Sequence, residues 1–126
     1  MIDAMYTAVA GLRVSAQRLG AAAQNIVNAR SSGRLEPYDG YVPVRVDQTT
    51  GGGSPRAVVR PLDTPSFPAY APGDPSANTE GLVGMPAVSL PSQFVESSVA
   101  RRSYAANAAV LRPGDELLQI LVDRQV

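Results

Sequence analysis

An unbroken heptad stripe of apolar side chains fills the first 26 residues and limits what this chain can fold into. The stripe recurs at alternating intervals of three and four residues: Ile2, Met5, Val9, Leu12, Ala16, Leu19, Ala23 and Ile26. This is the period of a helix that packs along a helical partner. No proline interrupts the stretch, so we expect one helix to about Ala29, about 40 Å long at roughly 1.5 Å per residue. The stripe is narrow and partly built of small residues, which favours close contact between helices over a globular core.

A second helix is expected after Ser89, a good N-cap residue, with Pro91 in the first turn where no N–H is needed. Its apolar positions form two stripes, one with Val95, Val99, Ala106 and Val110, the other with Phe94, Ala105, Ala108, Leu111, Leu118 and Val122. Two apolar faces predict that this helix is covered on more than one side. Pro113-Gly114 predicts a kink or a restart, with Asp115 and Glu116 at the new N-terminus.

The middle of the chain is predicted to be extended. Alternating valines predict a strand over 41–47, and a second short strand is expected over 56–60. The glycine-rich stretch 48–55 between them is predicted to form a long hairpin loop. Five prolines between 61 and 75 predict a stiff extended segment, and 81–88 a further extended piece. The fold class is therefore mainly α with a small β part: two terminal helices pairing as a coiled coil, joined by the hairpin and the proline-rich segment. Residues 1–30 with 89–126 form the terminal helical domain, and 31–88 the middle region.

Composition argues against most catalytic and ligand-binding functions. The 126 residues carry 11 arginines against 11 acidic residues, with no histidine and no cysteine. We therefore predict no catalytic, cofactor-binding or metal-binding residues. A net charge of zero argues against nucleic acid as the partner, so Arg101 and Arg102 beside Tyr104 are better explained as a solvated or ion-paired helix face. Gly51 to Gly53 lacks the lysine of a phosphate-binding loop.

We expect no cleaved signal peptide at the N-terminus. Ala8-Val9-Ala10 resembles a cleavage site, but Asp3 stands where positive charge is expected. No apolar run approaches the roughly 20 residues of a membrane span.

Three motifs in order resemble the flagellar basal-body rod proteins, specifically the proximal-rod family of the FlgC type. The first is Ala23-Gln24-Asn25-Ile26-Val27-Asn28-Ala29. The second comprises Tyr70, Pro72, Gly73, Pro75 and Ala77, followed by Gly81, Val83, Met85, Pro86 and Val88. The third comprises Arg102, Tyr104, Ala106 and Asn107. The resemblance covers nearly the whole chain. Pro113-Gly114 departs from it, because similar proteins usually continue the last helix there.

The resemblance implies a structural subunit of the proximal rod, the periplasmic drive shaft that transmits torque from the motor ring to the hook. Such proteins are exported by the flagellar type III apparatus without a cleaved signal. The implied partners are other copies, other rod proteins and the membrane ring of the motor, with no nucleic acid and no small-molecule substrate. The alternative is a small coiled-coil adaptor or binding module outside the rod.

Subunit contacts are expected along the helices. Asn25 and Asn28 fit either a bridge between subunits or the C-terminus of a helix, where Asn is common. The full set of expected contacts is Ile2, Met5, Val9, Leu12, Leu19, Asn25, Ile26, Asn28, Val95, Val99, Arg102, Tyr104, Asn107, Leu111, Leu118 and Val122.

Overall fold

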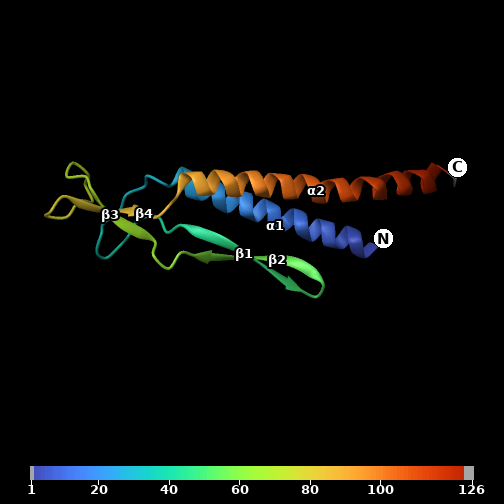
Figure 1. Ribbon diagram of the computed structural model, residues 1–126, viewed down its shortest axis with the longest axis horizontal. Helices are drawn as coiled ribbons and strands as arrows, with labels where there is room; N and C mark the ends of the chain where they lie inside the picture. The colour runs from blue at the N-terminus through green and yellow to red at the C-terminus, as the bar shows by residue number, and fades with distance from the viewer. Residues whose placement is uncertain (1, 124–126) are drawn as a thin grey trace.

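Two helices and two small antiparallel sheets make up the computed structural model, which describes the backbone of residues 2–123 and the side chains of residues 2–112. The elements in order are α1 (Ile2–Val27), β1 (Val44–Gly51), β2 (Ser54–Pro61), β3 (Ser66–Tyr70), β4 (Leu82–Pro86) and α2 (Leu90–Asp123). In Figure 1 the two helices lie side by side, and β1 and β2 run below α1. The β3–β4 sheet and its loops lie at the end of the molecule opposite to the chain termini. The prediction of a mainly α fold with a small β part is confirmed.

The helix boundaries follow the local sequence signals. α1 ends at Val27, two residues before the predicted end. α2 begins as predicted, because the Ser89 carbonyl accepts the first helical bond from the Gln93 N–H at 3.0 Å. Neither helix, within the residues described, is long and apolar enough to cross a membrane.

The predicted restart at Pro113-Gly114 is wrong. The backbone of α2 is helical from Leu90 to Asp123, and Figure 1 draws it as one long helix. A proline inside a helix costs about 3 kcal/mol through its missing N–H bond and its clash with the preceding turn. This cost does not end the helix here. The side chains of Asp115 and Glu116, predicted to cap a new helix, lie outside the described ones.

The hairpin was predicted correctly, but not its length. β1 and β2 pair from Val44 opposite Pro61 to Gly51 opposite Ser54, so the long loop predicted over 48–55 is wrong. Only Gly52 and Gly53 form the turn, and both have positive φ, at 62° and 80°. A two-residue turn of this kind matches the right-handed twist of the strands. Pairing can therefore continue right up to the glycines.

The second sheet uses part of the proline-containing segment. β3 pairs antiparallel with β4, and Pro68 in β3 lies opposite Gly84. β4 falls within 81–88, the piece predicted to be extended. Val83 in β4 is fully buried. Gly33, in the segment that follows α1, exchanges two backbone hydrogen bonds of 3.0 and 2.9 Å with Gly84 of β4. These bonds join the sheet to the segment after α1.

Gly81 is a position where the backbone requires glycine. Its φ is +76°, and an added Cβ would lie 2.9 Å from the Tyr70 ring and 3.1 Å from the Pro72 side chain. We expect Gly81→Ala to lower the free energy of unfolding by about 1–3 kcal/mol, measured by urea denaturation. Gly73→Ala is the matched control, because nothing lies within 4 Å of its added Cβ. Equal effects at the two positions would contradict this account.

Candidate functional site: the open faces of the helical pair

Small side chains form the contact between α1 and α2. The most deeply buried side chains of α1 include Ala8, Ser15 and Ala22, and Ala100 of α2 is fully buried. At Gly11 an added Cβ would lie 2.6 Å from the Asn107 side chain. The two helices therefore approach closely through alanine, glycine and serine, and the large apolar side chains are left to other faces.

The predicted heptad stripe lies next to this contact line rather than on it. Its positions are offset by one residue from Ala8, Ser15 and Ala22, which turns them by about 100° around the helix. Ile2 is 68% exposed and Leu19 is 37% exposed. Ala16 and Ala23 are also exposed, while Met5, Val9, Leu12 and Ile26 are half-buried. Half of the stripe residues are thus exposed in the single chain, and the other half are partly covered.

An open groove of about 480 Å³ lies on the C-terminal half of this stripe. Its lining consists of Ala16, Leu19, Gly20 and Ala23 from α1 with Arg101 and Tyr104 from α2. Small residues at the floor leave room for side chains of another helix. The arrangement resembles the holes that receive knobs in packed helices.

α2 carries a second uncovered apolar line. Val95, Val99 and Val110 are 64%, 42% and 49% exposed, and Ala106 is also exposed. At 100° per residue these four positions share one face of the helix. Together with the open groove, this line leaves both helices with apolar surface that nothing in the described part of the chain covers. Exposed apolar patches are typical of interaction sites.

Asn25 joins α1, the start of β1 and α2. Its amide nitrogen donates to the Val44 carbonyl at 2.7 Å and to Gln93 Oε1 at 3.0 Å. Its oxygen accepts from the Tyr41 hydroxyl at 2.9 Å and from the Val44 N–H at 3.0 Å. Burial raises the pKa of the Tyr41 phenol. All four bonding positions of this buried amide are therefore occupied.

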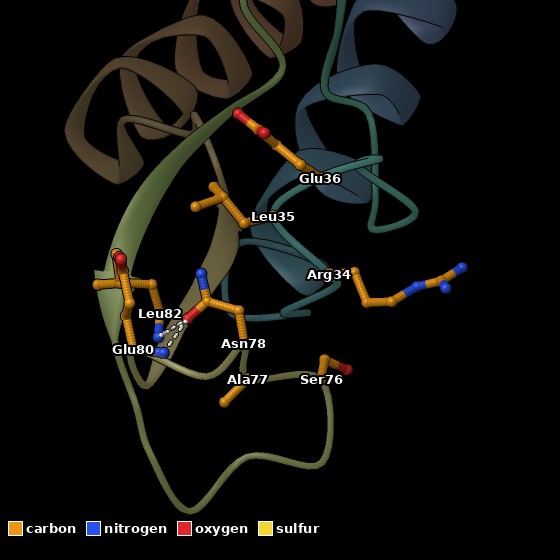
Figure 2. A pocket seen from close by; sticks show the side chains of 8 residues that line it. All are labelled: Arg34, Leu35, Glu36, Ser76, Ala77, Asn78, Glu80 and Leu82. Carbon is orange, nitrogen blue, oxygen red and sulfur yellow. Dashed lines mark hydrogen bonds between the residues drawn. The ribbon is translucent and has the colours of Figure 1, made fainter.

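A separate groove of about 330 Å³ lies at the β3–β4 end of the molecule (Figure 2). Asn78 shapes it, because its Oδ1 accepts the N–H groups of Glu80 at 3.0 Å and Leu82 at 2.9 Å. Arg34 binds Asp39 there, and hydrogen bonds from its guanidinium and its backbone N–H hold the pKa of that carboxyl below its usual value. These bonds hold the loops in shape. Among the described residues no cluster of three acidic side chains could hold a metal ion.

Comparison of the sequence with known proteins places this chain in a family. No family model matches the chain. A flagellar basal-body rod protein FlgC from Agrobacterium fabrum is 36% identical over 122 residues, covering 90% of this chain and 86% of that protein. The proteins of the same name from Salmonella typhimurium and Yersinia enterocolitica are 38% and 34% identical, covering 82% and 87% of this chain and 83% and 88% of theirs. The chain belongs to the FlgC family of flagellar basal-body rod proteins. It is therefore a structural subunit of the rod.

The motifs of the FlgC resemblance have structural roles in the described chain. Asn25 of the first motif makes the four bonds given above. Gly81 and Val83 of the second provide a positive φ and a fully buried side chain. Asn107 of the third packs against Gly11, and its amide donates to the Ser103 carbonyl at 2.9 Å.

The expected contact residues fall into three groups. Those on the open faces are Ile2, Leu19, Val95, Val99, Arg102 and Tyr104, all exposed, and Met5, Val9, Leu12, Ile26 and Leu111 are half-buried. Asn25, Asn28 and Asn107 make bonds within their own chain, and Asn28 Nδ2 donates to the Gln24 carbonyl at 2.9 Å. A bond from Asn25 to a neighbouring subunit would have to replace one of its four internal ones. The side chains of Leu118 and Val122 lie outside the described residues.

Proposed function

We propose that this chain is a proximal-rod subunit that assembles through its terminal helices. Residues 1–30 with 89–126 pair as a coiled coil and form the inner layer of a helical tube, and residues 31–88 pack outside it. The observation that carries this proposal is the open groove together with the uncovered valine line on α2. Covering both lines needs more than one neighbouring helix, which a tube of subunits supplies.

The proposed role is to transmit torque. The subunit contacts other copies, other rod proteins and the membrane ring of the motor, and it reaches the periplasm through the flagellar type III apparatus without a cleaved signal. The uncovered apolar faces of the two helices support assembly after export, because neighbouring subunits would cover them.

Deletion of the gene tests the proposal. We expect no hook and no filament, while the membrane ring of the motor still forms, as seen by electron microscopy of basal bodies. Re-expression of the parent chain should restore the hook and filament. Normal filaments in the deletion strain, with any second rod copy also deleted, would refute the proposed function.

A further inference from the structure

A groove between α1 and the hairpin carries two arginines that form no ion pair with any described residue. It has a volume of about 390 Å³ and is lined by Ala10, Arg13, Val14, Gln17, Ser54, Pro55, Arg56 and Ala57. We call it the arginine groove. Arg13 comes from α1 and Arg56 from β2, and both are exposed. Neither takes part in the ion pairs found among the described residues. The groove therefore presents uncompensated positive charge.

The rest of the hairpin does not balance this charge. Arg45 and Arg60 lie opposite each other in β1 and β2. Both form ion pairs with the carboxylate of Asp47, at 3.4 Å from Arg45 Nε and 3.1 Å from Arg60 Nε. Asp47 is the one acidic residue between 44 and 61, against three arginines. The hairpin as a whole is positive.

The opposite charge gathers at the other end of the β part. Residues 33–43 and 62–88, here called the acidic end, contain one arginine and five carboxylates: Glu36, Asp39, Asp63, Asp74 and Glu80. Arg34 forms an ion pair with Asp39, with 2.6 Å between Nε and Oδ2. The Ser32 hydroxyl and the Ser76 N–H bind Asp74 and lower its pKa.

Two of these carboxylates line one groove, and Asp63 is a third exposed one that forms no ion pair with a described residue. Glu36 and Glu80 line the groove of Figure 2 and form no ion pair with any described residue. Figure 2 shows Arg34 directed away from both of them. The acidic end therefore presents two exposed carboxylates in one groove, a charge complementary to that of the arginine groove.

We propose that the arginine groove of one copy binds the acidic end of a neighbouring copy, through Arg13 and Arg56 on one side and Glu36 and Glu80 on the other. The contact cannot close within one chain, because the turn of the hairpin points toward the end with the termini and β3–β4 lies at the opposite end (Figure 1). Two different faces then meet, which gives a heterologous contact that repeats from copy to copy. The inference rests on the proposed function in that it takes the neighbour to be a second copy.

A second copy fits better than a foreign acidic partner. The chain itself carries both complementary surfaces, and its net charge is zero, so whole copies do not repel one another. Complementary charge also fixes the register of docking more than it adds affinity. The contact would thus orient subunits that the open helix faces hold together.

Charge exchange tests the contact in the full chain. Arg56→Glu and Glu80→Arg should each reduce incorporation into purified basal bodies roughly tenfold, and the double variant should restore it. Arg30→Glu is the control, because Arg30 is exposed, forms no ion pair with a described residue and does not line the groove. Its incorporation should stay near that of the parent. Normal incorporation of both single variants, or a double variant no better than either one, would overturn the proposal.

Crosslinking identifies the partner directly. The chain has no cysteine, so Arg56→Cys combined with Glu80→Cys should give covalent dimers of this chain in basal bodies with a short thiol-reactive linker. Each single cysteine should give none. Crosslinks from position 56 to a different protein would overturn the assignment to a second copy. A different result is a double charge variant that fails to restore incorporation in a strain whose rod is lost when this gene is deleted. That result would refute this contact alone and leave the proposed function standing.

Discussion

Leu19→Asp is expected to fold like the parent chain and to fail to enter the rod. Leu19 lines the open groove and is 37% exposed, so a carboxylate there stays in water while the chain is alone. When a neighbouring helix covers the groove, the same carboxylate loses its water without gaining a partner, which costs several kcal/mol. A cost of about 3 kcal/mol corresponds to roughly a hundredfold loss of affinity at each contact. Immunoblots of purified basal bodies measure the incorporation.

Gln24→Asp provides the matched control for Leu19→Asp. Gln24 is exposed on the same helix and does not line the open groove. We expect this variant to swim and to incorporate normally. The helix content of both purified variants, measured by circular dichroism, should equal that of the parent. Normal motility of Leu19→Asp would mean that the open groove stays uncovered in the assembly.

The two helices could be predicted from periodicity, but the face that joins them could not. The stripe from Ile2 to Ile26 dominates the pattern because its residues are the more apolar ones. The contact with α2 uses Ala8, Ser15 and Ala22 instead, since helices that approach closely need short side chains. The sequence did contain a signal for this line, because Ala8, Gly11, Ser15 and Ala22 follow one another at intervals of three, four and seven residues. Hydrophobicity alone does not rank such a line first.

Backbone geometry explains the other differences from the sequence predictions. The run Gly51-Gly52-Gly53 has the composition of a flexible loop, yet two positive φ values are enough to make the tightest hairpin turn. Pro113 is a residue that usually interrupts a helix, yet the backbone of α2 continues through it. In the hairpin the local preference for irregular chain is overridden by strand pairing up to the glycines, and in α2 the backbone stays helical on both sides of Pro113. Single-residue propensities cannot show such an outcome.

The role of Asn25 also lay beyond sequence reasoning, because its partners are distant in the chain. Residues 41, 44 and 93 come together only after the hairpin folds back on α1 and α2 packs beside it. The motif around Asn25 marked the residue as important. It did not distinguish a bond to another subunit from a bond within the chain.

Asn25→Leu is expected to lower the free energy of unfolding by about 3–5 kcal/mol. Leucine has the same number of side-chain heavy atoms as asparagine, but it removes four hydrogen bonds at once. The Val44 N–H and carbonyl and the Tyr41 hydroxyl then lose a partner in a part-buried site. Each such unsatisfied group costs about 1–3 kcal/mol. Urea denaturation of the purified chain measures the total.

Asn28→Leu separates the Asn25 network from a general effect of removing an amide. Asn28 is three residues further on, and its side chain bonds only to Gln24 and Ser31, both nearby in sequence. Its loss should cost less than about 1 kcal/mol. Amide hydrogen exchange adds a local measurement, because in Asn25→Leu the Val44 N–H should lose protection before the rest of β1 does. Equal stability losses at the two positions would mean that Asn25 does not hold β1 and α2 to α1, and the rigid attachment of the hairpin to the helices would then need another cause.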